Sequence, residues 1–224
     1  MSNAFKYYFK IIFFLFFIVF SGSLSAQTIA EKTVNMVKYE GYFNFYFEPV
    51  NGKIWLEIDK LDQEFLYVNS LATGVGSNDI GLDRGQLGDQ RIVKFTRIGS
   101  KILMIQPNYR YRAISDNPDE VRAVKDGFAE STLAGFFVSA ESNGSVLVDI
   151  TSFLMQDAHN VSGKLQKKGE GSYNIDPLRS ALYMPRTKNF QKNTEFEAQL
   201  TFRGKAKGNN IRSVTPTPSA LTVR

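Results

Sequence analysis

The sequence predicts an α+β fold that is mainly antiparallel β with one well-marked amphipathic helix. Phe and Tyr are abundant, with 19 and 10 copies against one Trp, and aromatic side chains favour strands. Three pairs of short apolar segments are each joined by a two-residue turn, which imposes antiparallel pairing. One segment, 117–133, begins with a helix-start signal and continues with apolar residues at helical spacing. The composition, 43% hydrophobic and 22% charged, is typical of a globular domain with a buried core.

Residues 1–26 have the order of a secretory signal peptide. Lys6 and Lys10 precede the apolar run 11–20, and small residues lead to Ala26. The run is shorter than the roughly 20 residues that a membrane-spanning helix needs, so no stable membrane anchor is expected after cleavage. The protein is therefore expected to be exported to the periplasm, the outer envelope or the medium. Residues 27–37 are interpreted as an N-terminal extension.

The charge and the residue counts exclude several classes of function. Cleavage removes Lys6 and Lys10 and no acid, so the net charge falls from +5 to +3, and no nucleic acid is expected as a partner. The absence of cysteine excludes disulfides, thiol nucleophiles and cysteine-ligated metals. His159 is the only histidine, so a site with two imidazole ligands cannot be built from this chain. We expect His159 to be a structural, hydrogen-bonded side chain.

Alternating polar and apolar residues define the expected strands. The turns at Asn51-Gly52, Gly99-Ser100 and Asn143-Gly144 have the residue types of tight hairpins. A short helical turn is expected at 151–156, and the polar stretch 160–174 has no clear pattern. The expected strands are 42–47, 53–58, 64–69, 91–97, 101–106, 135–140, 145–150 and 193–202.

The one clear helix begins at Asn117, which has the right side chain for an N-cap. Pro118 suits the first helical position, and the two acids that follow complement the helix dipole. Val121, Val124 and Phe128 then fall on one face. We expect this face to pack against the core.

The glycine-rich loop 74–88 is the main candidate for a site. Its glycines lack the GxGxxG spacing and no helix pattern follows, which argues against a nucleotide. The loop offers side-chain oxygen donors for a calcium ion. However, it lacks the ligand spacing of an EF-hand and the Glu at the twelfth position of that motif. No catalytic residue, metal ligand or cofactor is therefore assigned to this chain. We expect Asn78, Asp79, Asp83 and Arg84 to form an interdomain or regulatory contact.

The sequence of this loop, GVGSNDIGLDRGQLG, also resembles that of a known family. It is similar to the N-terminal, non-catalytic region of secreted bacterial zinc-dependent metalloproteases, a region termed DUF5117. The resemblance extends over 38–224, which implies a β-rich non-catalytic domain in that range. The other segments that carry it are 64–71, 146–154, 157–159, 179–180 and 193–195.

The resemblance implies a partner. In that family a metzincin-like catalytic domain with the motif HExxHxxGxxH follows, and zinc is bound there. This chain lacks the motif, so it is expected to be truncated before that domain, and zinc is expected only in the missing part. The expected partner is thus a metalloprotease catalytic domain, in cis or as a separate chain. The domain would act as a scaffold for the catalytic domain, position its substrate or inhibit it. If it inhibits by binding the catalytic zinc, Asp83 is the residue expected to do so. The alternative is a free-standing secreted β-rich binding module for glycan, peptide or a partner protein.

Overall fold

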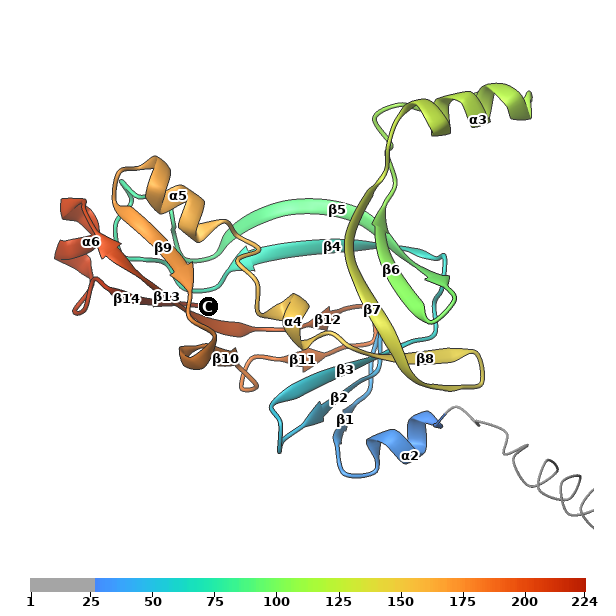
Figure 1. The fold of residues 1–224 in the computed structure, drawn as a ribbon, viewed down its shortest axis with the longest axis horizontal. Coiled ribbons are helices and arrows are strands. Elements are labelled where there is room, and N and C mark those ends of the chain that lie inside the picture. Colours follow the sequence, from blue (N-terminus) through green and yellow to red (C-terminus); the bar gives the residue numbers. More distant parts are fainter. Residues whose placement is uncertain (1–26) are drawn as a thin grey trace, which may run out of the picture.

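A computed structural model describes residues 27–224, and the predicted signal peptide, residues 1–26, lies outside them. The described chain is mainly antiparallel β, as predicted (Figure 1). The strands are β1 (Val37–Tyr39), β2 (Phe45–Glu48), β3 (Lys53–Ile58), β4 (Glu64–Leu71), β5 (Gln86–Ile98), β6 (Lys101–Gln106), β7 (Ser131–Ser142), β8 (Ser145–Asp149), β9 (Gly171–Ile175), β10 (Ala181–Leu182), β11 (Lys188–Asn189), β12 (Thr194–Glu195), β13 (Ala198–Ala206) and β14 (Ala220–Val223). The helices are α2 (Ile29–Thr33), α3 (Pro118–Gly127), α4 (Thr151–Leu154), α5 (Val161–Lys167) and α6 (Asn209–Val214), with a 3₁₀ turn at Pro177–Arg179.

Eight strands form a large sheet that curls into a half-barrel. Their order is β1-β2-β3-β8-β7-β6-β5-β4, and every neighbouring pair is antiparallel. The three predicted hairpins are confirmed as β2–β3, β5–β6 and β7–β8. Gly52, Gly99 and Gly144 have positive φ angles of 61°, 59° and 83°, which glycine adopts without steric cost.

The concave face of the large sheet encloses the first core. Alternate residues of each strand point into it, so Ile54 and Leu56 of β3 are buried there beside Val146 and Val148 of β8. Aromatic rings fill much of the remaining space: Phe43, Phe45, Phe95 and Phe136 are all buried. This core is built from side chains that are predicted, from the alternating pattern, to share one face of the sheet.

The expected N-terminal extension, residues 27–37, is packed against the convex face of the large sheet. Helix α2 begins with a capping box in which Thr28 and Glu31 exchange side-chain and backbone hydrogen bonds. Its Ile29 is buried with Trp55 and Leu147, which point to the opposite side of the sheet from the first core. The sequence did not mark this helix, because it is only one turn and a half long.

A small sheet forms the second part of the molecule. Strand β13 lies at its centre and pairs with β9, β10 and β14. Helices α5 and α6 lie at this end of the molecule (Figure 1). Leu165 of α5, Ile211 of α6 and Phe202 of β13 are fully buried in a second core. The polar stretch 160–174 thus contains α5 and β9.

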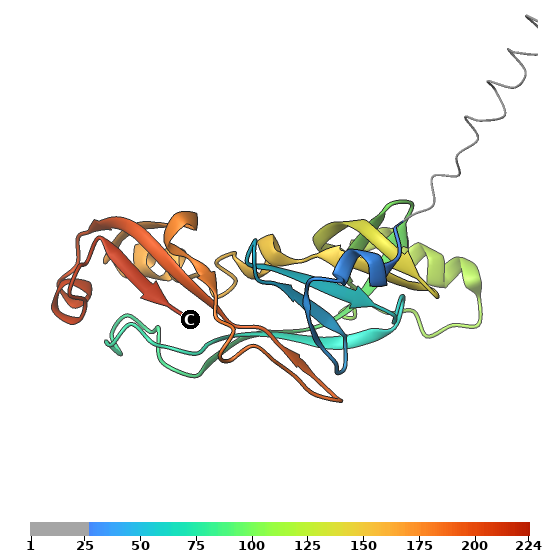
Figure 2. The ribbon, with the colours of Figure 1, turned by 90° about the horizontal axis from the view of Figure 1, so that it is seen from below.

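The predicted strand 193–202 is split into two. Thr194–Glu195 forms β12, a hairpin partner of β11, and the chain then enters the small sheet as β13. Figure 2 shows this hairpin reaching back from the small sheet towards the large one. The alternating pattern continues through the break because Phe196 also points inwards, where it packs on Phe45 with ring centroids 5.0 Å apart.

The predicted helix forms over Pro118–Gly127, which is shorter than the predicted 117–133 because strand β7 begins at Ser131, and its expected position in the core is wrong. The Asn117 cap is confirmed, since its side chain accepts a hydrogen bond of 3.0 Å from the Asp119 amide. No residue of α3 is buried, and the expected face, with Val121 and Phe128, is 44% and 41% exposed. The reason is topological: residues 107–130, here named the arm, project beyond the adjacent strands β6 and β7 (Figure 1). Four other helices accompany α3 in the described chain, so the single-helix description is too simple.

None of the helices between residues 27 and 224 has the length and apolar character needed to cross a membrane.

Two isoleucines offer a matched test of the first core. Ile102 is fully buried, whereas Ile114 on the arm is fully exposed. We expect Ile102→Ala to lower the free energy of unfolding by about 2–5 kcal/mol, because it removes buried methylenes and leaves a cavity. Ile114→Ala is expected to change it by less than about 0.5 kcal/mol. Urea denaturation of residues 27–224 measures both, and equal effects would contradict the assignment of the core.

Candidate functional site

A large cavity lies between the two sheets. It has a volume of about 810 Å³ and is here named the slot. Consecutive residues 65–72, which belong to β4 and the residue after it, line one side. Residues 192–198, from two residues before β12 to the start of β13, line the other. The slot therefore runs between two extended segments of chain.

The floor of the slot is aromatic. Phe65 and Phe95 lie 5.1 Å apart by ring centroid, and Phe136 meets Phe153 edge to face at 5.9 Å. Tyr67 adds a ring 5.8 Å from Phe153, and burial raises the pKa of its hydroxyl. An apolar ligand surface would be favoured here, since it would release water from these rings.

Polar groups gather where β4 ends. His159 Nε2 lies 2.9 Å from Gln86 Oε1, and His159 Nδ1 lies 3.4 Å from Asn69 Nδ2. Asn69 Nδ2 also donates to the Ala158 carbonyl at 3.0 Å, while its Oδ1 is buried without a hydrogen-bond partner. Burial is the main cause that lowers the pKa of His159, and the charge of Lys164 acts in the same direction. His159 is thus held neutral by its surroundings.

The position of His159 follows from the start of α5. The Asp157 carboxylate accepts hydrogen bonds from the amides of Val161 at 2.7 Å and Ser162 at 2.9 Å, so it caps this helix. Asn160 adopts a left-handed conformation with φ 54° and turns the chain into the helix. Asp157 is therefore occupied by the helix amides, and Gln86 and Asn69 make the contacts to the imidazole.

Arg224 lies at the same end of the slot. Its guanidinium is 3.0 Å from Glu197 Oε1 and stacks over Tyr183, 4.2 Å from the ring centroid. Its main chain pairs with residues after β4: the carbonyl accepts from the amides of Ala72 at 2.7 Å and Thr73 at 3.2 Å. This end of the slot is therefore closed by main-chain hydrogen bonds.

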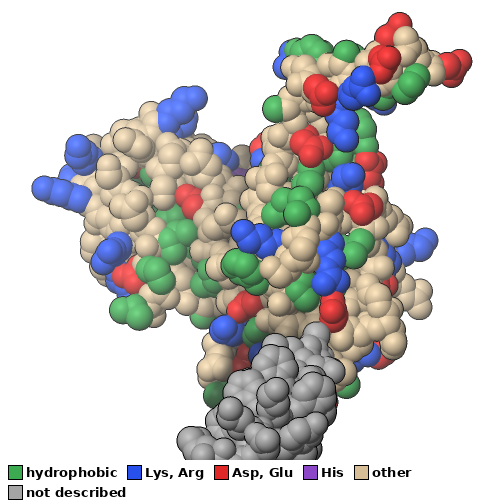
Figure 3. All heavy atoms as spheres, turned by 45° about the vertical axis from the view of Figure 1, so that its right-hand side comes forward, with side chains coloured by type: hydrophobic (Ala, Val, Ile, Leu, Met, Phe, Trp, Pro, Cys, Tyr) green, Lys and Arg blue, Asp and Glu red, His purple; other side chains and the backbone are tan. Residues whose placement is uncertain are grey.

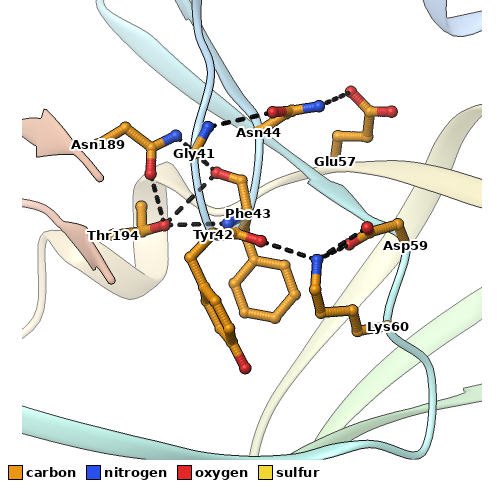
Figure 4. Close-up of polar contacts among 9 residues, drawn as sticks. All are labelled: Gly41, Tyr42, Phe43, Asn44, Glu57, Asp59, Lys60, Asn189 and Thr194. Carbon is orange, nitrogen blue, oxygen red and sulfur yellow. Dashed lines mark hydrogen bonds and ion pairs between the residues drawn. The ribbon is translucent and has the colours of Figure 1, made fainter. Parts of the chain in front are cut away.

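The β11–β12 hairpin is fixed as a wall of the slot by a polar clamp with the loop before β2 (Figure 4). Asn189 Nδ2 donates to the carbonyls of Tyr39 at 2.9 Å and Phe43 at 2.8 Å. Thr194 Oγ1 donates to Asn189 Oδ1 at 2.8 Å and accepts from the Phe43 amide at 3.1 Å. Gly41 permits the close approach, because a Cβ at this position would lie 2.7 Å from the Phe190 carbonyl oxygen.

The residues predicted from the glycine-rich loop do not line the slot. The loop is anchored by Val75, Ile80 and Leu82, which are buried in the second core. The four candidate side chains, Asn78, Asp79, Asp83 and Arg84, are all exposed, and within residues 27–224 neither Asp83 nor Arg84 forms a salt bridge. Over the same range no three His, Asp or Glu side chains are grouped as a metal site would need.

Sequence reasoning did not find the slot. Its polar end joins Asn69, Gln86 and His159, which are distant along the chain and belong to no spacing motif. The one signal that pointed there was the Asp157-Ala-His159 segment. It is explained by the cap on α5.

The neutral state of His159 predicts a pH dependence of stability. Its pKa in the folded chain lies below the ordinary value of 6.5, so as the pH falls through about 6.5 the unfolded chain binds a proton first. The free energy of unfolding should therefore decrease between about pH 7.5 and 5.5. In His159→Gln this decrease should become smaller. Urea midpoints of both proteins at the two pH values measure it, and equal slopes would contradict the burial of a neutral imidazole.

The clamp predicts that Gly41 tolerates no side chain. We expect Gly41→Ala to cost about 1–3 kcal/mol of stability, because the added methyl group must displace Asn189 or the Phe190 backbone. The β11–β12 hairpin should then be cleaved faster by trypsin at Lys188 or Lys192. Gly127→Ala is the control, since a Cβ there meets no atom within 4 Å. Unchanged cleavage in Gly41→Ala would show that the clamp does not hold the hairpin.

In a comparison with known protein families, two family models match the chain. Residues 85–224 match the model described as Domain of unknown function (DUF5117), and residues 26–74 match Domain of unknown function (DUF5118). No curated protein and no solved structure matches the chain. The predicted resemblance is confirmed for the DUF5117 part, although residues before 74 match a different model. With a match over more than half of its length, the chain belongs to the DUF5117 family.

Proposed function

We propose that residues 27–224 act as the non-catalytic N-terminal domain of an exported zinc-dependent metalloprotease-like protein. In this proposal they scaffold or regulate a protease domain that is absent from this chain, and zinc is bound in that domain. Membership of the DUF5117 family and the resemblance of the sequence to the N-terminal region of such proteases support the assignment. The signal-like residues 1–26 support export.

The exposed apolar side chains of the arm are the main support for the scaffolding role. The arm presents these side chains to solvent on a projecting element (Figure 3). Ile114 is fully exposed, and Tyr111 stacks on Phe128 with ring centroids 4.0 Å apart while both remain more than 40% exposed. An amphipathic helix normally buries its apolar face, and contiguous exposed apolar side chains mark contact surfaces. In the proposal the protease domain covers this face.

The slot favours a second role, that of a binding module. It is a cavity of about 810 Å³ with an aromatic floor and a few polar groups at one end, which is the usual composition of a ligand site. This role needs no protease domain. Ligand binding by residues 27–224 alone therefore tests this role.

The scaffolding role is tested first on the gene. The DNA that follows the Arg224 codon should encode HExxHxxGxxH, in the same frame or after one frameshift. The domain containing that motif is then expressed, and its binding to residues 27–224 is measured by titration calorimetry. A stop codon with no zinc motif encoded after it would contradict the proposal.

Substitutions on the arm locate the contact. Val121→Asp places a charge on the exposed apolar face of α3 and should weaken binding of the protease domain by about tenfold or more. Ala123→Asp places the same charge on another side of the helix and should leave binding nearly unchanged. Both variants should keep the circular dichroism of the parent, because α3 has no buried residue. Equal binding by the two variants would exclude the arm as the contact.

A further inference from the structure

One edge of the large sheet is open along the slot. Strand β4 is the last strand in the order, and among the described strands it pairs only with β5. In an antiparallel ladder, alternate residues of an edge strand point their N–H and C=O groups away from the neighbour. Residues 65–72 line the slot without interruption, so the free edge of β4 borders it. An eight-residue edge that opens into a cavity offers a template for another strand.

The chain already uses this edge at one end. Arg224 follows β14, and its carbonyl accepts hydrogen bonds from the amides of Ala72 and Thr73, directly beyond β4. Its own amide donates to Thr73 Oγ1 at 2.8 Å. Main-chain pairing is therefore compatible with the shape of the slot at the point where β4 ends. The remaining length, beside residues 65–70, has no such partner within residues 27–224.

The residues that line the slot indicate which side chains a bound strand should carry. Successive residues of a strand point to opposite sides, so every second side chain would meet the aromatic floor at Phe65 and Tyr67. The opposite rim carries Arg186 and Lys192, which form no salt bridge with any residue from 27 to 224. Three acids also line the slot. Glu197 pairs with Arg224 and Asp157 caps α5, whereas the exposed Glu195 accepts a hydrogen bond from Asn193 and forms no salt bridge among residues 27–224.

We propose that the slot binds an extended peptide segment of another protein, which adds to the large sheet as a strand beside β4. The segment carries apolar or aromatic residues at alternate positions and an acidic residue that meets Arg186 or Lys192. Main-chain hydrogen bonds to β4 hold the segment, and the aromatic floor selects its side chains. This inference goes beyond the scaffolding role and gives the binding role its ligand class.

The test uses residues 27–224 and a set of labelled peptides of the form acetyl-Thr-X-Thr-X-Thr-X-Glu-amide, in which X is Val, Leu or Phe. Matched controls carry N-methyl groups on alternate backbone nitrogens, in both registers. These controls keep every side chain and lose the N–H donors along one edge. At least one peptide should give saturable fluorescence anisotropy, and its N-methylated form in one register should bind at least about tenfold more weakly.

Two further measurements locate the site. The amides of residues 65–70 that point away from β5 should gain protection from hydrogen exchange when the peptide is bound. Lys192→Glu should weaken binding, whereas Lys188→Glu, exposed on β11 and outside the slot, should not. Failure of all peptides to bind, or equal binding in both N-methylated registers, would overturn the proposal.

Sedimentation of the peptide-free protein tests whether a second copy of the chain occupies the open edge instead. A dimer in which the outward-facing β4 amides are already protected, with no change when the peptides are added, would assign the edge to a second copy and overturn the proposal. A monomer in which these outward-facing amides are unprotected is the expected result. None of these outcomes depends on a protease domain, so failure here leaves the scaffolding role to its own test.

Discussion

The β4–β5 ladder is the constraint on which the rest of the structure depends, because one pair of strands serves two cores. Phe65 of β4 packs into the first core, and Leu71, at the end of the same strand, is buried in the second. Strand β5 likewise carries Phe95 in the first core and places Gln86 against His159. Since side chains alternate along a strand, a slip of one residue in either part of this pairing would turn the core side chains of that part outwards. The register shifts between Val68 and Ser70, so each core is served by its own stretch of the ladder. The slot lies along the free edge of β4.

The parts of the fold that depend on neighbours in sequence were predictable. Gly52, Gly99 and Gly144 occupy turns that need a positive φ angle, so the three hairpins could be located from residue type alone. The slot depends instead on contacts such as that between Asn189 and Phe43, more than a hundred residues apart. Nothing in the local pattern of either residue indicates this contact.

The expected position of α3 in the core is wrong, whereas the expected contact of the glycine-rich loop stays a prediction. The spacing of Val121 and Phe128 predicts a helix with one apolar face, and that helix forms, but periodicity carries no information about what covers the face. The glycine-rich loop shows the opposite case. Its polar residues suggested a site, whereas its buried side chains, Val75, Ile80 and Leu82, explain why it is structured. In both segments the sequence pattern describes the local conformation, and the surrounding topology decides its exposure.

The order of strands in the large sheet has a consequence for the two family models. The DUF5118 range contains β1 to β4, and the DUF5117 range contains β5 to β8. In the sheet the second group lies in the middle, with β1, β2 and β3 at one side and β4 at the other. Two pairs, β3–β8 and β4–β5, therefore join a strand of one range to a strand of the other. Both ranges contribute strands to the large sheet, so a boundary drawn between them cuts through it.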